Sequence, residues 1–182
     1  MKQLFTALPL ALATAITLTA APAMANHHEE GEQDVTVTST LELPADATWQ
    51  HSFDSAKGEK GALNAGIGRA LAFYRMMEEE GVAADRVKVA VVIHGSATFD
   101  VANDARYAAK YGTGDDGQPA RNPNYNNVAE LIAKGGEIWV CGVAAKYHKV
   151  GDDDVLAGVQ FAPSAMVAHA ELQRRGFSLN PY

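Results

Sequence analysis

The chain has 182 residues, of which 47% are hydrophobic and 20% are charged. This length and composition are typical of one globular domain and exclude an intrinsically disordered chain. The formal net charge of −7 argues against nucleic acid as a partner, because binding to phosphates requires clustered Lys and Arg.

Residues 1–25 have the features of a signal peptide. Lys2 precedes the uncharged apolar stretch 4–20, and Ala23-Met24-Ala25 fits the small-x-small rule for cleavage. The stretch is short and rich in alanine, and no second apolar run of about 18 residues follows, so we expect no membrane insertion. These features predict a periplasmic or secreted protein that is cleaved after Ala25.

Residues 26–47 are predicted to form an N-terminal extension to a domain at 48–182. Cleavage after Ala25 would expose Asn26-His27-His28, and a histidine at the third position of a chain can help to bind Cu(II) or Ni(II) in a square plane. A solvated tail is the simpler interpretation. Alternation of Val and Thr over 35–38 predicts a short edge strand.

Within the domain, the longest helical pattern covers residues 58–80. Apolar residues recur there at spacings of three or four and form one stripe, which contains Leu63, Ile67, Leu71, Tyr74 and Met77. Gly81 follows the last turn, where glycine commonly ends a helix.

The remaining elements alternate between strands and helices. We expect strands at 48–53, 86–93, 159–161 and 177–179 and one that ends at Cys141, and helices at 97–111, 126–134, 144–148 and 165–175, the last with Ser164 as N-cap. This alternation predicts an α/β fold with right-handed crossovers and a mostly parallel sheet covered on both faces.

Cys141 is the only cysteine in the chain, so no disulfide can form within it. It ends the apolar run Ile138-Trp139-Val140, and a helix is expected to start at once. The start of a helix, together with Lys146 and His148, favours the thiolate, which is the nucleophilic form. The alternative is a buried structural cysteine, which is a common fate for a single Cys.

His94 ends the other long buried strand and is followed by Gly95-Ser96. If the two strands are parallel neighbours, His94 and Cys141 share the crevice at the carboxyl ends of the strands, where α/β proteins bind ligands. His94 could then act as a base or a hydrogen-bond donor. The alternative is a histidine whose ring hydrogen-bonds the loop backbone and fixes the turn.

Four segments of the domain follow one another in a recognisable order. They are Val91-Val92-Ile93-His94-Gly95, Glu130-Leu131-Ile132-Ala133-Lys134-Gly135-Gly136, Ile138-Trp139-Val140-Cys141-Gly142-Val143-Ala144-Ala145, and the stretch from Pro163-Ser164-Ala165-Met166 to Gly176-Phe177. This ordered set resembles the DsrE/DsrF-like family, which includes sulfur-relay subunits. The resemblance implies a three-layer α/β/α sandwich with a five-stranded sheet, assembled as trimers or hexamers. It also implies that Cys141 carries persulfide sulfur between a donor protein and an acceptor protein.

From these observations we expect a sulfurtransferase-like sulfur carrier with Cys141 as its catalytic residue. The expected binding residues are His94, Gly95, Ser96, Gly142 and Lys146, and no metal or other cofactor is expected. The alternative is a non-catalytic oligomeric module that binds a small ligand and in which Cys141 is structural. Oxidant sensing at Cys141 is a third hypothesis, although the chain has no second cysteine to resolve a sulfenic acid.

Overall fold

The computed structural model describes residues 36–44 and 46–180. The predicted signal peptide and the Asn26-His27-His28 motif lie outside the described residues. Residues 36–40 contain no helix or strand and are exposed, so the strand predicted at 35–38 is wrong for its described part. The α/β domain lies within the unit that begins at Leu41.

The domain is built on one sheet of five strands, all of them parallel, in the order β4-β3-β2-β1-β5. The strands are β1 Trp49–Ser55, β2 Val87–Ile93, β3 Glu137–Cys141, β4 Gln160–Ala162 and β5 Ser178–Asn180. The helices are α1 Ala65–Glu79, α2 Asp104–Tyr111, α3 Tyr125–Ala133, α4 Gly142–His148 and α5 Ala165–Arg174, with 3-10 turns η1 Ala84–Arg86, η2 Gly95–Val101 and η3 Asp152–Asp154.

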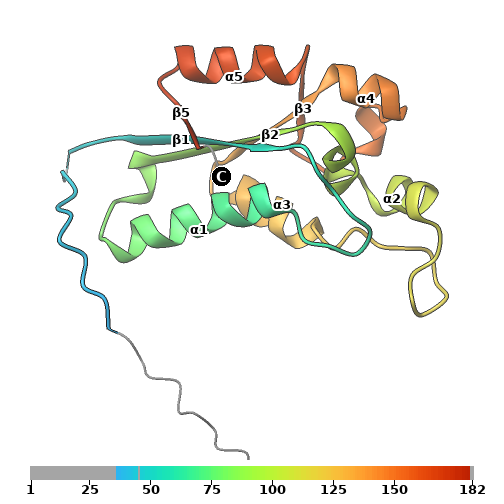
Figure 1. Cartoon of the computed structure of the whole chain (residues 1–182), viewed down its shortest axis with the longest axis horizontal. Helices are drawn as coiled ribbons and strands as arrows, with labels where there is room; N and C mark the ends of the chain where they lie inside the picture. The colour runs from blue at the N-terminus through green and yellow to red at the C-terminus, as the bar shows by residue number, and fades with distance from the viewer. Residues whose placement is uncertain (1–35, 45, 181–182) are drawn as a thin grey trace, which may run out of the picture. The chain divides into compact units, whose positions relative to one another are not determined.

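The elements form three layers. Helices α1 and α3 cover one face of the sheet, α5 covers the other, and α4 and α2 lie beyond the carboxyl ends of β3 and β2 (Figure 1). The predicted α/β/α sandwich with a five-stranded sheet is confirmed. The sheet is entirely parallel because a helix or helical segment crosses between each pair of strands that are consecutive in the chain.

Helix α1 begins at Ala65, seven residues later than predicted. The side chain of Asn64 caps it by accepting a hydrogen bond of 3.0 Å from the backbone N–H of Ile67. The loop before α1 is bound to α2 instead of joining the helix, because the N–H of Gly61 donates to the hydroxyl of Tyr107. Leu63 therefore lies outside the helix and is exposed, whereas the other four residues of the predicted stripe are buried.

The helix predicted at 97–111 is interrupted at Ala102 and Asn103. Ala102 is extended and pairs with Val155, and the backbone N–H of Asn103 donates to the carbonyl of Asp154. The Asn103 side chain then caps α2 by accepting from the N–H of Arg106. Asparagine favours the start of a helix over its interior, because its side-chain oxygen can accept from the free N–H groups of the first turn.

Two separate cores result from the alternation of side chains along the strands. Val89, Val91 and Ile93 of β2 belong to a cluster of 18 buried residues beneath α1 and α3, whereas Ala90 and Val92 belong to a cluster of six beneath α5. The small cluster is the one on the side of the sheet where the candidate site lies.

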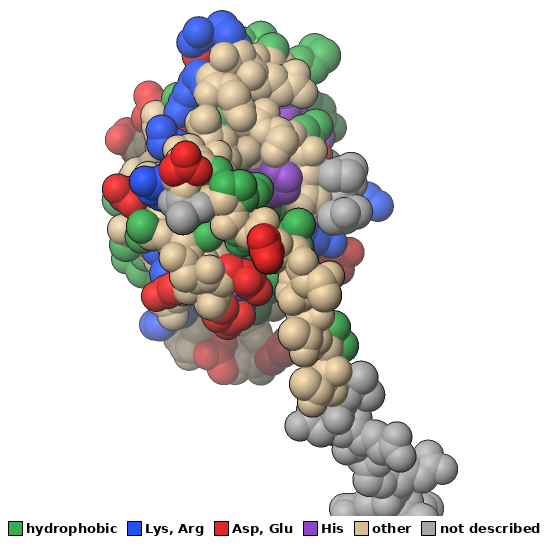
Figure 2. Space-filling model, turned by 90° about the vertical axis from the view of Figure 1, so that its left-hand side faces the viewer, with side chains coloured by type: hydrophobic (Ala, Val, Ile, Leu, Met, Phe, Trp, Pro, Cys, Tyr) green, Lys and Arg blue, Asp and Glu red, His purple; other side chains and the backbone are tan. Residues whose placement is uncertain are grey.

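No helix among the residues that the structure describes is both long and apolar enough to cross a membrane. Acidic and basic side chains are interspersed on the face shown in Figure 2, and the acidic ones are prominent in its lower half. In the sequence as a whole, 22 Asp and Glu outnumber 15 Lys and Arg.

Candidate functional site

Cys141 is the last residue of β3 and comes directly before α4. Its thiol is free and buried, with 7% of the residue exposed. Trp139 and Ala162, the latter paired with Cys141 in β4, both belong to the core beneath α5, so the alternation places Cys141 on the α5 face. Gly142 follows because a Cβ there would lie 2.8 Å from the carbonyl oxygen of Ala162.

His94 lies at the same edge of the sheet, directly after β2. Strands β2 and β3 are parallel neighbours, and Ile93 is paired with Val140, so His94 and Cys141 are each one residue beyond that pair. The backbone of His94 is still extended, and its N–H donates to the carbonyl of Ser55 in β1. His94 therefore continues the alternation of β2 and faces α5, as Cys141 does.

The His94 ring is bonded to a carboxylate that the sequence did not reveal. Its Nε2 lies 3.1 Å from both carboxylate oxygens of Asp54 in β1. The same carboxylate binds a second histidine, because Nε2 of His169 in α5 lies 2.8 Å from Asp54 Oδ1. The side chains of Asp54, His94 and His169 are 42%, 32% and 17% exposed.

The two histidines change the ionisation of Asp54. Partial burial acts to raise the pKa of this carboxyl, but the hydrogen bonds from His169 and His94 outweigh it and hold the pKa below its usual value. Asp54 is therefore an anion that faces two imidazole rings at the carboxyl edge of the sheet. We refer to Asp54, His94 and His169 as the His–Asp–His cluster.

Gly95 and Ser96, which were predicted as binding residues, hold the turn after β2. Gly95 has a φ of +54°, and a Cβ there would lie 2.5 Å from the carbonyl oxygen of Ala56. The Ser96 hydroxyl accepts a hydrogen bond of 2.9 Å from the N–H of Gly58. Both residues thus fasten the loop after β1 to the end of β2.

The two basic side chains expected beside the thiol differ in their surroundings. Lys146 is exposed on α4. The ring of His148 packs edge-on against Phe99 with ring centroids 5.0 Å apart, and the carbonyl of His148 accepts from Arg106. His148 is therefore part of the packing between α4 and η2.

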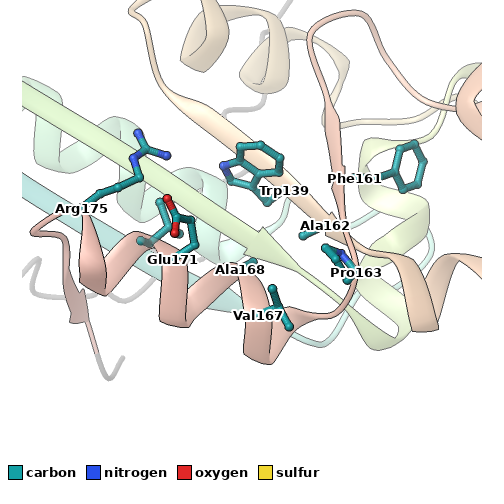
Figure 3. Close-up of a pocket in the computed structure, with 9 residues that line it drawn as sticks. Trp139, Phe161, Ala162, Pro163, Val167, Ala168, Glu171 and Arg175 are labelled. Carbon is teal, nitrogen blue, oxygen red and sulfur yellow. The ribbon is translucent and has the colours of Figure 1, made fainter.

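An apolar groove of about 140 Å³ lies on the α5 face, between α5 and strands β3 and β4, and Cys141 is not among its lining residues. The residues that line it are Trp139 of β3, Phe161, Ala162 and Pro163 of the β4 segment, and Val167, Ala168, Glu171, Leu172 and Arg175 of α5 and its end (Figure 3). Ala162, one of the lining residues, is paired with Cys141 in the sheet. The groove could hold a small apolar group between α5 and the sheet.

A buried polar network joins the end of β1, the start of α1 and η2 near the carboxyl edge of the sheet. Asp100, which is 1% exposed, accepts a hydrogen bond of 2.7 Å from the side chain of Asn64, which also bonds to Ser55. Desolvation raises the pKa of Asp100 to about 6, and the bond from Asn64 offsets this only in part. The network fixes the start of α1 against η2.

No group of three or more His, Cys, Asp or Glu side chains among residues 36–44 and 46–180 is arranged to hold a metal ion. The sequence did not predict Asp54 or His169. The available signals were weak: Asp54 alternates with the apolar Phe53, and His169 directly follows Ala168 of the buried stripe of α5.

Comparison with known proteins identifies the family. The model of the DsrE/DsrF-like family matches residues 56–180, which is more than half of the chain, so the protein belongs to this family. No curated protein matches. Similar solved structures include a protein of unknown function, MTH1491, from Methanobacterium thermoautotrophicum, with 16% identity and a TM-score of 0.49, and the ychN protein from E. coli, with 11% identity and a TM-score of 0.43. Each match covers 72% of this chain and 97% of the other.

Proposed function

We propose that this member of the DsrE/DsrF-like family carries sulfur as a persulfide on Cys141. The observation that carries the proposal is the position of the thiol, at the end of a strand inside a parallel sheet and at the edge where α/β proteins place their reactive groups. The resemblance to sulfur-relay members, in which a cysteine after a sheet strand bears the persulfide, supports the same role.

The chemistry needs a persulfide donor and an acceptor thiol. The Cys141 thiolate attacks the outer sulfur of a donor persulfide, a new S–S bond forms at Sγ, and the donor S–S bond breaks to release the donor as a thiol. Transfer to an acceptor thiol repeats the same exchange. Lys146, exposed on α4, would attract an anionic donor, and burial of Cys141 would shield the persulfide from water.

Mass spectrometry tests the carrier role directly. The mature chain is treated with glutathione persulfide or thiosulfate and digested, and the peptide that contains Cys141 should gain one sulfur atom. A Cys141→Ser variant should gain none. The proposal fails if the wild-type peptide stays unmodified, or if the variant takes up sulfur equally.

We also propose that the chain is exported and assembles with copies of itself. The signal-peptide pattern of residues 1–25 supports export, and sequencing the mature terminus after periplasmic fractionation should find Asn26 first. Exposed apolar side chains on α4 and α5 support assembly; they are Val143, Tyr147, Met166 and Val167. Light scattering should give three or six times the mass of one chain.

The burial of Cys141 supports a second candidate function, a non-catalytic module that binds a small apolar ligand in the groove beside α5. In that case Cys141 should react slowly with iodoacetamide in the folded protein, and Cys141→Ala should leave ligand binding intact. Rapid alkylation of the folded chain would exclude this candidate.

A further inference from the structure

The His–Asp–His cluster fixes which ring nitrogen of His94 can take up a proton. An ionised carboxylate only accepts hydrogen bonds, so His94 and His169 each donate to Asp54 through Nε2–H. A neutral imidazole has one N–H, and therefore in the neutral ring Nδ1 of His94 is the nitrogen that can accept a proton. Asp54 is placed to stabilise the imidazolium that forms when Nδ1 accepts a proton.

Cys141, His94 and Asp54 come from three strands that are adjacent in the sheet. The order β3-β2-β1 places His94 between the other two, and all three side chains are on the α5 face at the carboxyl edge. Neighbouring strands lie about 4.8 Å apart, so the Cys141 side chain starts one strand spacing from that of His94. A nucleophile, a base and an orienting carboxylate thus follow one another across the sheet.

We propose that His94 is the acid–base residue for sulfur transfer at Cys141, and that Asp54 and His169 are positioning residues for its ring. This inference rests on the proposed persulfide function. His94 Nδ1 takes the proton of the Cys141 thiol as Sγ attacks the outer sulfur of the donor. The protonated ring then returns this proton to the departing donor thiolate, so thiol and persulfide enter and leave in equal numbers, with no net oxidation.

Helix α5 contributes His169 to the His–Asp–His cluster. His169 of α5 binds the same Asp54 oxygen as His94 does, so the carboxylate is held by two histidines from different elements. Nδ1 of His169 is buried and has no hydrogen-bond partner. The bond to Asp54 is therefore the polar contact by which His169 ties α5 to the sheet beside the thiol.

The test measures the rate of persulfide loading by quenched-flow mass spectrometry. General acid–base catalysis contributes about 10²- to 10⁴-fold, so His94→Ala should slow loading by at least about 100-fold. Added imidazole should restore part of the rate in His94→Ala and none in wild type. The matched control is His51→Ala, which removes a histidine from β1 whose ring packs on Phe53 and Phe73 of the α1 side.

The positioning role proposed for Asp54 is tested by separate measurements. Asp54→Asn should slow loading about tenfold or more and Asp54→Glu should recover most of the rate, whereas a merely structural role would affect both alike. The ¹⁵N shifts of the imidazole should show the Nε2–H tautomer of His94 in wild type and a loss of that preference in Asp54→Asn.

The outcomes separate this inference from the carrier proposal. If wild type takes up no sulfur, both fail. If wild type loads Cys141 and His94→Ala loads it at the same rate, or if imidazole restores nothing, the carrier role stands and the acid–base role is wrong. An Nδ1–H tautomer of His94 in wild type would also overturn the acid–base role, since that nitrogen could not then accept a proton.

Discussion

The two faces of the sheet differ in what they bury: one carries the larger apolar core, and the other carries the candidate site. Beneath α1 and α3, every second residue of the central strands enters the larger core. The buried carboxylate of Asp100 on η2 accepts a hydrogen bond from Asn64 at Oδ2 and has no partner at Oδ1. Beneath α5, a single helix covers the strands, and beside the small core lie the groove, the thiol and the His–Asp–His cluster.

The two faces differ because a different number of helices covers each. Two helices bury most of the apolar residues on one face, so that face stabilises the fold. One helix leaves the carboxyl edge of the other face partly open, so side chains there can remain both ordered and accessible. The two carboxyl groups also differ in pKa as a result. Asp54 is partly solvated and has a lowered pKa, whereas burial raises the pKa of Asp100 to about 6.

Matched leucine truncations should give the largest contrast between the faces. Leu131 of α3 lies in the larger core, and Leu172 of α5 lies in the small core and lines the groove. Leu131→Ala should lower the free energy of unfolding by about 3–5 kcal/mol, and Leu172→Ala by about 2–3 kcal/mol, because the space left beside a groove can be filled by solvent or by small movements. Urea denaturation measures both, and a larger loss for Leu172→Ala would contradict the comparison.

Asp100 should make stability fall as the pH rises. The folded chain holds the Asp100 proton up to a pH of about 6, but the unfolded chain releases it near 3.8, so the folded state binds more protons in this interval. The free energy of unfolding should lose up to about 3 kcal/mol between pH 4 and 6 from this group.

Asp100→Asn removes that titration while keeping an oxygen that accepts from Asn64. The difference in unfolding free energy between variant and wild type, measured by urea denaturation at several pH values, should therefore move in favour of the variant as the pH rises. A difference that stays constant from pH 4 to 7 would show that Asp100 does not titrate in this range.

Asp54 should show the opposite sign on the α5 face. Its pKa is lower in the folded state than in the unfolded state, so its contribution is present above the unfolded pKa of 3.8 and is lost as the pH falls through the folded value. Solvent screens this exposed group, so Asp54→Asn should cost under about 1 kcal/mol at pH 7 and nothing in strong acid. A cost that grows toward acid pH would contradict this sign.

The smallest effect is expected at the other end of α5. Glu137 of β3 binds Arg175 just after the helix, and these hydrogen bonds from Arg175 hold the pKa of Glu137 below its usual value. Glu137→Gln keeps an acceptor for the indole N–H of Trp139 and should cost under about 1 kcal/mol, less at high salt. Thermal melts at two salt concentrations measure it, and loading of Cys141 should be unchanged because the pair lies at the far end of β3.

Particular residues show how far the sequence could be used to predict the fold and the site. The apolar runs of β2 and β3 predicted buried parallel strands, and the spacing of Ile67, Leu71 and Tyr74 predicted α1, because burial of apolar surface is local in its periodicity. The start of α1 and the break before α2 were missed. Both depend on Asn64 and Asn103, whose cap bonds compete with backbone patterns that look helical.

The sequence by itself determined the strand ends that carry His94 and Cys141, since a strand ends where its apolar run meets glycine and polar residues. Only the tertiary structure decided that Asp54 of β1 and His169 of α5 meet beside them, 115 residues apart in the chain. Hydrogen bonds between polar side chains leave no periodic signal in the sequence. They form where strand order and a crossing helix bring the groups together, and that order is fixed by the packing of the whole sheet.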